Sequence, residues 1–305
     1  MVSSREIAVL IPCLNEEKTI SLVIKKIRSQ LKKSSIYLFD NDSTDESKKI
    51  AKDEGAIVFN VKNRGKGNVV RRMFSQIDAD IFVMIDADDT YDVSCINKMI
   101  NLLKEENLDM VVAKRISKDS KAYRFGHEIG NKIFSKLVKF TFGSKIDDLF
   151  SGFRVFSKKF VKSFPCNSVG FEIETELTIH ALEQRLDVAE IECLYSSRPI
   201  GSQSKLKTYE DGFKILNLIL ILIKDEKPLL FFAFLSSSFL ISSLSIGIPV
   251  IFEFIETGLV DRLPRAVLSG IMMVIAFLCF FSGLILDVVK KSRQEMKRLM
   301  YLSIK

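Results

Sequence analysis

Two stretches near the C-terminal end of the chain carry no charged residue, and they constrain the fold more than any other feature. They are residues 229–252 (LLFFAFLSSSFLISSLSIGIPVIF) and residues 266–286 (AVLSGIMMVIAFLCFFSGLIL). As helices they would be about 36 Å and about 31 Å long, whereas the hydrocarbon core of a bilayer is about 30 Å thick. The sequence therefore predicts a two-helix transmembrane anchor over residues 228–288. An apolar content of 47% agrees with a partly embedded protein.

Charges beside the two stretches predict their orientation. Basic residues next to a span stay on the cytoplasmic side of the membrane, and the residues after the second stretch are strongly basic. We therefore expect a basic cytosolic tail over residues 289–305, and two spans then place residues 1–212 in the cytosol as well. Residues 213–227 (FKILNLILILIKDEK) predict an amphipathic helix in the membrane interface. The basic tail residues are Lys290, Lys291, Arg293, Lys297, Arg298 and Lys305.

Residues 1–212 alternate short apolar runs with helix-like segments, which indicates an α/β domain with a mostly parallel sheet and helices on both faces. A mixed α+β domain remains the alternative. The predicted strands are 7–11, 36–39, 56–61, 80–85, 110–113 and 188–195, and the predicted helices are 17–31, 44–54, 68–77, 94–105 and 171–185.

Charge and cysteine content narrow the class further. The net charge is +7, which suits a membrane surface, a phosphate-bearing ligand or nucleic acid. The basic residues form no recognisable nucleic-acid module, so we expect no nucleic-acid partner. The five cysteines are scattered without a CxxC pair, which argues against structural zinc and a disulfide framework.

One strand end is unusually acidic. The predicted strand 80–85 runs directly into DADD (86–89), and ligands of open α/β sheets bind at the carboxyl ends of strands. Carboxylates gathered there need a counter-charge, and Mg²⁺ typically takes one or two carboxylates together with phosphate oxygens. The spacing of Asp86 and Asp88 therefore suggests a metal–diphosphate site. Alternatively, Asp88 to Asp92 cap the helix that follows.

Neighbouring strand ends are polar too. The first predicted strand leads into PCLNEE (12–17), the second into DNDSTD (40–45) and the third into NRGKG (63–67). Asp40 can accept a hydrogen bond from a base, whereas we expect Ser43 and Asp45 to cap the next helix. Gly65 and Gly67 would let backbone N–H groups approach a phosphate.

In this order, IPCLNEE, DNDSTD, RGKG and DAD resemble glycosyltransferase family 2 with its GT-A nucleotide-sugar-binding fold. Four later segments are similar to the polyprenyl-phosphate branch of that family, typified by dolichyl-phosphate mannose synthase. These segments are AKR (113–115), DDLFSGFR (147–154), FEIETEL (171–177) and RPIGSQSK (198–205). The two apolar stretches match bacterial members that carry a membrane anchor.

The resemblance implies a metal-dependent hexosyltransferase that moves a sugar, with inversion, from a UDP- or GDP-sugar to undecaprenyl or dolichyl phosphate. It implies Mg²⁺ or Mn²⁺ on Asp86 and Asp88, and catalytic roles for Asp88, Asp148 and Arg115. Nucleotide-sugar binding falls to Pro12, Asn15, Glu16, Asp40, Lys66, Asp86 and Ala87. Acceptor-phosphate binding falls to Arg115, Arg124, Arg198, Ser204 and Lys205.

The chain departs from that pattern at three positions. Thr90 stands where the branch usually has a Gln on the metal side, AKR replaces Gly-Ser-Arg, and Asn41 replaces the second Asp of a pair. The sugar is therefore not carried over from the family. A lipid phosphate is already mostly ionised, so Asp148 serves as a base or an orienting group, or lies in a structural turn.

Two other functions remain as alternatives: a catalytically silent membrane subunit that binds nucleotide sugar, and a transferase to a different membrane acceptor. A processive polysaccharide synthase is disfavoured because its QxxRW motif needs a Trp and this chain has none. A homo-oligomer is compatible with the sequence.

Overall fold

The computed structural model describes residues 6–116, 146–170, 172–196, 221, 224–260 and 262–304. The chain forms two compact units. The first contains Met1–Gly212 together with Lys297–Lys305, and the second contains Phe213–Met296. Of the predicted interfacial helix (213–227), residues 221 and 224–227 are described and the others lie outside the described residues.

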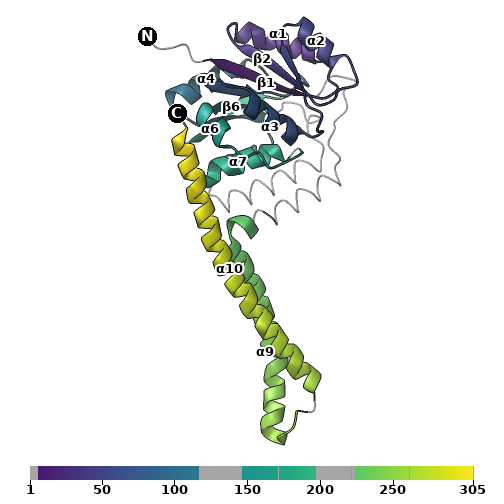
Figure 1. The fold of residues 1–305 in the computed structure, drawn as a ribbon, viewed down its shortest axis with the longest axis vertical. Helices are drawn as coiled ribbons and strands as arrows, with labels where there is room; N and C mark the ends of the chain where they lie inside the picture. Colours follow the sequence, from purple (N-terminus) through teal and green to yellow (C-terminus); the bar gives the residue numbers. More distant parts are fainter. Residues whose placement is uncertain are drawn as a thin grey trace. The chain divides into compact units, whose positions relative to one another are not determined.

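The first unit is built on a sheet whose order is β3-β2-β1-β4-β6-β5-β7 within the described residues (Figure 1). All neighbouring strands pair in parallel except β6, which runs antiparallel to both β4 and β5. The predicted mostly parallel α/β sheet is therefore confirmed. The strands are β1 (Ile7–Cys13), β2 (Ser35–Asp40), β3 (Ile57–Asn60), β4 (Ile81–Met84), β5 (Met110–Ile116), β6 (Arg154–Ser157) and β7 (Val188–Leu194).

The antiparallel strand β6 was not predicted, and it determines what meets at the functional edge of the sheet. Arg154, its first residue, pairs with Met84 at the end of β4 and with Val112 in β5. The amino end of β6 therefore lies beside the carboxyl end of β4 and the middle of β5. As a result, the segment before β6 meets the acidic segment after β4.

Helices cover both faces of the sheet, as the alternating sequence predicted (Figure 1). Apolar side chains of α1, α2 and α4 join one continuous buried cluster with inward-facing strand residues. On the other face Phe74 of α3 packs against Phe82 and Phe156, and Phe160 of α6 stacks on Phe156. The helices are α1 (Ile20–Gln30), α2 (Ser47–Asp53), α3 (Lys66–Gln76), α4 (Cys95–Glu105), α6 (Lys158–Ser163) and α7 (Ile173–Glu183).

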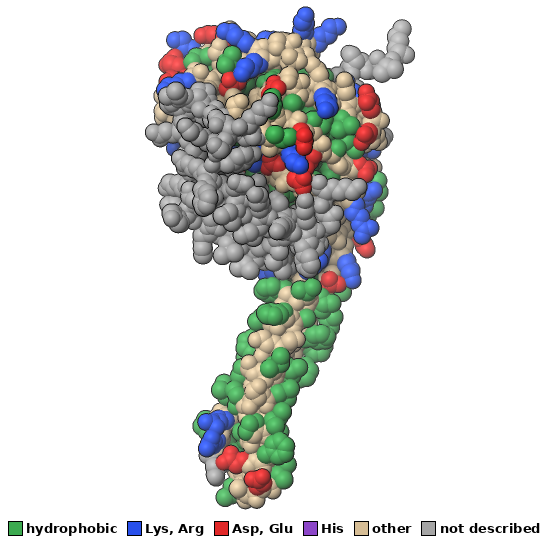
Figure 2. Space-filling model, turned by 180° about the vertical axis from the view of Figure 1, so that it is seen from behind, with side chains coloured by type: hydrophobic (Ala, Val, Ile, Leu, Met, Phe, Trp, Pro, Cys, Tyr) green, Lys and Arg blue, Asp and Glu red, His purple; other side chains and the backbone are tan. Residues whose placement is uncertain are grey.

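The second unit is a helix pair formed by α9 (Pro228–Thr257) and most of α10 (Leu263–Ser303). Both helices are long and apolar enough to cross a membrane, and only 6% and 11% of their most apolar windows are buried. Figure 2 shows hydrophobic side chains along the pair and charged side chains gathered at its loop end. The predicted spans thus fall inside two real helices.

Small and hydroxylated residues let α9 and α10 approach closely. Ser243 and Ser269 bond reciprocally, each hydroxyl donating to the other's backbone carbonyl at 2.8 and 3.0 Å. A Cβ added to Gly247 would come within 2.4 Å of Ser269 Oγ. Such contacts are typical of membrane helix pairs, because lipid offers no partner for a polar group.

The end of α10 belongs to the first unit. Lys297 forms an ion pair with Glu183 at 2.7 Å, and the Tyr301 hydroxyl donates to Asp109 Oδ1 at 2.8 Å. The sequence predicted a basic tail over these residues. In the structure the last turns of α10 are helical and bind acidic groups at the ends of α7 and near the start of β5.

Candidate active site

The loops after β1 and β2 are joined by a row of hydrogen bonds at the carboxyl edge of the sheet. The backbone N–H of Asn15 donates to Ser43 Oγ at 2.9 Å, and that of Glu16 donates to Ser47 Oγ at 2.8 Å. The prediction that Ser43 caps a helix is therefore wrong, because its hydroxyl binds the other loop. Asp45 has both roles: it accepts from the N–H of Ser47 at the start of α2 and from the N–H of Glu17.

Asp40 ends β2 and is fully buried. Its Oδ2 accepts from the backbone N–H of Ser43 at 3.0 Å and lies 3.2 Å from Lys48 Nζ. Its Oδ1 has no hydrogen-bond partner within the described part of the chain. Such an orphaned acceptor is costly unless another donor satisfies it, which fits the predicted role of accepting from a nucleobase.

Asn41 ties the end of β2 to the loop before α3. Its amide nitrogen donates to the carbonyls of Val61 and Asn63, and its Oδ1 accepts from the N–H of Gly65 at 2.8 Å. An aspartate could not make the two donated bonds. The Asn41 departure from the family pattern therefore has a structural reason.

The glycines of the NRGKG segment serve packing inside the protein. The N–H of Gly67 donates to the carbonyls of Val169 and Gly170. A Cβ on Gly65 or Gly67 would come within 2.3 or 2.1 Å of backbone oxygens in the 168–169 segment. The expectation that these two N–H groups bind a phosphate is wrong, because both already have protein partners.

Lys66, between the two glycines, lies in a buried charge cluster. Its ammonium is 2.5 Å from Asp86 Oδ1 and 2.6 Å from Glu174 Oε1. Burial alone would lower the pKa of Lys66, but the charges of Asp86 and Glu174 outweigh it and raise that pKa above its ordinary value. Burial raises the pKa of Glu174, against the opposing charge of Lys66. Glu174 was quoted in a motif of the sequence but was not predicted as a site residue.

Asp86 is held from a second side by the segment before β6. A Cβ added to Gly152 would come within 2.2 Å of Asp86 Oδ2, so a side chain there would displace the Asp86 carboxylate. The N–H of Gly152 in turn donates to the buried Tyr91 hydroxyl at 2.9 Å. Neither Tyr91 nor Gly152 was predicted as a site residue, because the antiparallel course of β6 brings them to Asp86.

Asp88 is buried and oriented by Thr90. The Thr90 hydroxyl donates to Asp88 Oδ1 at 2.6 Å, and the Thr90 N–H lies 3.3 Å from the same oxygen. Thr90 therefore binds Asp88 rather than pointing into the site as a ligand. The capping alternative is right for Asp92, which accepts from the N–H of Ser94 at 2.9 Å before α4.

Arg115 and Asp148 form a two-bond ion pair at the end of β5. Arg115 Nε donates to Asp148 Oδ2 and Nη2 donates to Oδ1, both at 2.7 Å, and the Arg115 N–H also donates to Oδ2 at 3.1 Å. The N–H groups of Asp147 and Asp148 both donate to the Glu190 carboxylate. Asp148 thus orients Arg115, and Glu190 holds Asp148.

Arg154 was also missed by sequence reasoning. It is completely buried, and its guanidinium donates to the carbonyls of Leu149 and Ser151 and to the Thr178 hydroxyl. Burial lowers the pKa of Arg154 to about 10. Its bonds connect the DDLFSG segment to α7, so it fixes the loop that carries Asp148.

The remaining predicted residues divide into two groups. Pro12 lies in β1 opposite Phe39, and the carbonyl of Ala87 accepts from the Thr19 hydroxyl at 2.7 Å. Four predicted acceptor-phosphate residues lie outside the described residues: Arg124, Arg198, Ser204 and Lys205.

The carboxylates after β4 suit a hard divalent cation. Among the described residues, no group of three or more His, Cys, Asp or Glu forms a metal site by itself. Mg²⁺ and Mn²⁺ prefer oxygen ligands, and Mg²⁺ needs only one or two carboxylates when phosphates and water complete its shell. Asp86 and Asp88 therefore fit a cation whose coordination shell water and a diphosphate complete.

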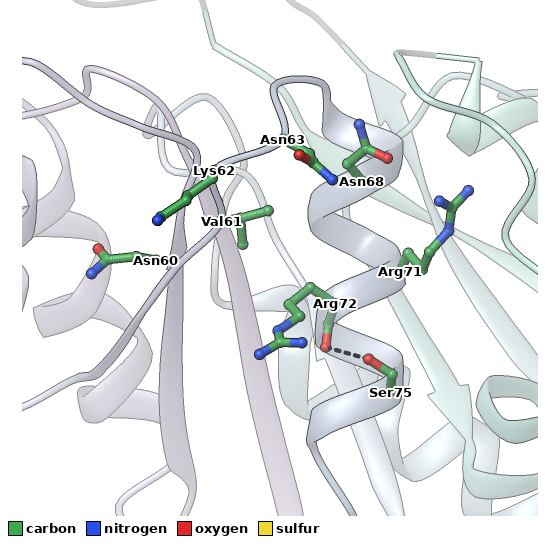
Figure 3. A pocket seen from close by; sticks show the side chains of 8 residues that line it. All are labelled: Asn60, Val61, Lys62, Asn63, Asn68, Arg71, Arg72 and Ser75. Atoms are coloured by element: carbon green, nitrogen blue, oxygen red, sulfur yellow. Dashed lines mark hydrogen bonds between the residues drawn. The ribbon is translucent and has the colours of Figure 1, made fainter.

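A separate open pocket of about 300 Å³ lies between the end of β3 and α3 (Figure 3). It contains none of the predicted site residues. Its lining is polar and basic, formed by Asn60, Val61, Lys62, Asn63, Asn68, Arg71, Arg72 and Ser75. Arg71 also donates to the carbonyl of Cys166 at 2.7 Å.

Comparison with known proteins identifies the family of the domain. The sequence profile of Glycosyl transferase family 2 matches residues 8–164. An uncharacterized protein of Shigella flexneri is 49% identical over 157 residues, 52% of this chain and 96% of that protein. Glycosyltransferase AglJ of Haloferax volcanii is 28% identical over 298 residues, 96% of this chain and 97% of that protein. A dolichyl-phosphate hexose transferase of the same organism is 24% identical over 222 residues, 73% of this chain and 96% of that protein.

A solved structure shares the fold. Glucosyl-3-phosphoglycerate synthase from Mycobacterium tuberculosis, in complex with Mn²⁺ and uridine-diphosphate-glucose, superposes with a TM-score of 0.58 at 24% identity. The match covers 72% of this chain and 79% of that one. The predicted GT-A fold is confirmed by this similarity.

Proposed function

Since the chain belongs to glycosyl transferase family 2, we propose that it transfers a hexose, with inversion, from a UDP- or GDP-sugar to a membrane polyprenyl phosphate. One observation carries the proposal most directly. The acidic segment after β4 and the Arg115–Asp148 pair at the end of β5 lie at the same edge of the sheet, in a chain with two helices apolar enough to span a membrane. The relative named for a dolichyl-phosphate acceptor supports the lipid class.

On the donor side, Asp40 would accept from the base, and Lys66 would act on the diphosphate. Asp86 and Asp88 would hold Mg²⁺ or Mn²⁺, and such an ion, when bound, stabilises the charge of the departing nucleotide. The solved structure with Mn²⁺ and uridine-diphosphate-glucose supports a divalent ion and a nucleotide sugar as what this side binds. The Asn15 and Glu16 loop, fastened to the Ser43–Ser47 loop, would form the wall of the nucleoside site.

On the acceptor side, the reaction needs a phosphate oxygen aimed at the anomeric carbon. A phosphate monoester has its second pKa near 6, so the acceptor needs no general base at neutral pH. Arg115, oriented by Asp148, would hold the phosphate with its planar guanidinium. We assign Asp148 a positioning role, because Arg115 engages both of its oxygens. Arg124, Arg198, Ser204 and Lys205 complete the proposed acceptor set.

The two helices would anchor the enzyme beside its lipid substrate. We propose a cytosolic catalytic domain over residues 1–212, an interfacial helix over 213–227, an anchor over 228–288 and a cytosolic end over 289–305. The basic residues after the second span support this orientation. Such an anchor would hold the catalytic domain on the membrane that contains the acceptor phosphate.

A transfer assay tests the proposal. The purified full-length chain in detergent is incubated with polyprenyl phosphate, Mn²⁺ or Mg²⁺, and a panel of labelled UDP- and GDP-sugars. Label that enters the lipid fraction from one donor, and is lost on chelation, is the expected result. Asp92→Asn serves as the matched control for Asp88→Asn, since Asp92 lies four residues away and its carboxylate accepts from the N–H and the hydroxyl of Ser94. A folded chain that binds nucleotide yet labels no lipid would indicate a silent subunit or another acceptor.

A further inference from the structure

Lys66 lies between two carboxylates that come from different parts of the chain. Its ammonium is 2.5 Å from Asp86 Oδ1 and 2.6 Å from Glu174 Oε1. All three side chains are largely buried, with exposed fractions of 11% for Lys66, 24% for Asp86 and 5% for Glu174. One positive charge thus faces two negative charges where little water can screen them, which leaves the trio acidic.

One carboxylate oxygen of Glu174 accepts no hydrogen bond from the part of the chain that the structure describes. Its Oε2 is buried and has no hydrogen-bond partner within the described residues. Leaving such an oxygen unsatisfied is costly, so the arrangement is incomplete on the Glu174 side. Asp86, by contrast, has a short side chain that lies close to Gly152, where an added Cβ would come within 2.2 Å of Oδ2. An ammonium on a flexible four-carbon stem can move toward Glu174 more easily than Asp86 can move away.

We propose that Lys66 is a resident counter-ion, which occupies Asp86 until a divalent cation binds there. Glu174 is a positioning residue that retains the displaced ammonium next to the site. This inference rests on the proposed function, because it takes Asp86 as a ligand of the donor's metal. It adds a role for Glu174 and a reason for the position of Lys66.

Charge balance supports this sequence of events. A divalent cation and an ammonium cannot share one carboxylate oxygen without strong repulsion. If the ammonium moves onto Oε2 of Glu174, the trio and the cation together carry one net positive charge. That charge suits an incoming diphosphate, and the ammonium remains within reach of it. Without Glu174, displaced Lys66 would lose the buried carboxylate that lies 2.6 Å from its ammonium.

Mn²⁺ binding to the full-length chain in detergent tests the proposal without any turnover. The probe is Mn²⁺ alone, with free Mn²⁺ measured by electron paramagnetic resonance. Lys66→Met should tighten Mn²⁺ binding about tenfold, because the cation no longer has to displace an ammonium. Glu174→Gln should weaken it several-fold, because Lys66 then stays on Asp86. Lys66→Arg keeps the charge and should remain within about threefold of the unmodified chain.

Lys26→Met is the matched control, because Lys26 pairs with the adjacent Asp89 at 2.7 Å and does not bind Asp86. It should leave Mn²⁺ affinity nearly unchanged. Equal tightening by Lys26→Met and Lys66→Met would overturn the proposal in favour of a general charge effect. Weakening by Lys66→Met, or no Mn²⁺ binding by the unmodified chain, would overturn it too.

These outcomes are distinct from failure of the proposed function. If Lys66→Met raises Mn²⁺ affinity and Glu174→Gln lowers it in a chain that transfers no sugar to lipid, that result would support the counter-ion role of Lys66 and contradict the proposed lipid acceptor. If the chain transfers sugar to lipid but neither substitution changes its Mn²⁺ affinity, the proposed function is supported and the counter-ion role of Lys66 is wrong.

Discussion

The proposed donor and acceptor sides of the candidate site differ in how their buried charges are balanced. On the donor side Lys66 faces both Asp86 and Glu174, so negative charge is in excess. On the acceptor side Arg115 and Asp148 match one to one through two hydrogen bonds of 2.7 Å. Both lie at the same edge of one sheet, and both are largely buried.

This difference indicates what each side is prepared to receive. An acidic excess attracts a cation, which fits a metal that accompanies the diphosphate. A matched pair is already neutral, so Arg115 alone adds little net charge for a lipid phosphate. Further positive charge must come from other residues, and the predicted Arg124, Arg198 and Lys205 fall outside the described residues. We therefore propose that the excess negative charge on the donor side binds a cation, whereas Asp148 on the acceptor side orients Arg115.

The largest expected effect tests the donor side. Asp88→Asn removes a charge from the acidic excess while keeping the shape that Thr90 holds. We expect sugar transfer to fall about 10²–10³-fold, since a metal ion contributes several kcal/mol of transition-state stabilisation and each 1.36 kcal/mol is tenfold. Initial rates at saturating donor and acceptor measure it. Activity within about threefold of the unmodified chain would break the comparison, because the acidic excess would then have no catalytic use.

A substitution on the acceptor side should lower the stability of the folded chain. Asp148→Asn leaves the buried Arg115 guanidinium without its counter-charge, which costs about 3–5 kcal/mol in comparable sites. Urea unfolding in detergent, followed by circular dichroism, measures the change in the free energy of unfolding.

The control for Asp148→Asn is the neighbouring ion pair between Lys114 on β5 and Asp147 on the same loop. Lys114 and Asp147 are 2.7 Å apart but 33% and 41% exposed, so Asp147→Asn should cost less than about 1 kcal/mol. If Asp148→Asn keeps full stability but loses transfer activity, Asp148 acts on the reactants and the orienting role is wrong.

A buried histidine tests how much burial itself, the largest cause of its pKa shift, affects stability. His180 packs edge-on against Phe160 and Phe164, and burial lowers its pKa to about 4. An unfolded histidine takes up a proton near pH 6.5. Between those values protonation favours the unfolded chain, so stability is full above pH 6.5 and falls as the pH drops toward 4, by about 3 kcal/mol.

His180→Phe should therefore flatten the acid side of the stability curve while changing little at pH 7.5. Urea midpoints measured from pH 4.5 to 7.5 on both proteins test this expectation. Parallel curves for the two proteins would show that burial of His180 does not govern acid stability, and that the carboxylates of the site do.

The sequence predicted the donor side of the fold well because its signals are local. The four apolar runs that became β1 to β4 each end in polar residues, and the carboxyl ends of parallel strands meet by topology alone. Asp40, Asp86 and Asp88 could therefore be placed at one edge from the chain order. The two apolar stretches could be predicted as long helices from their length and their lack of charged residues.

The missed features all depend on distant contacts. The four residues of β6 carry no turn signal that would reveal an antiparallel course, so Gly152 and Tyr91 were not placed beside Asp86. Glu174 reaches Lys66 across more than a hundred positions, counting from 66 to 174. The Ser43 hydroxyl could serve its own helix or another loop, and only the fold decides between them. Composition cannot identify such partners.

The smallest predicted effect refines the donor side. Thr90→Val keeps the shape of the side chain but removes the hydroxyl that donates to Asp88 Oδ1 at 2.6 Å. Loss of a partner that orients a metal ligand typically costs about tenfold in metal affinity. We expect that loss in a Mn²⁺ titration, with sugar transfer restored by excess Mn²⁺. Thr90→Ser retains the hydroxyl and should bind Mn²⁺ within about twofold of the unmodified chain. If Thr90→Val binds Mn²⁺ normally, the Thr90 hydroxyl does not orient Asp88 for metal binding, and the proposed role of this hydrogen bond is wrong.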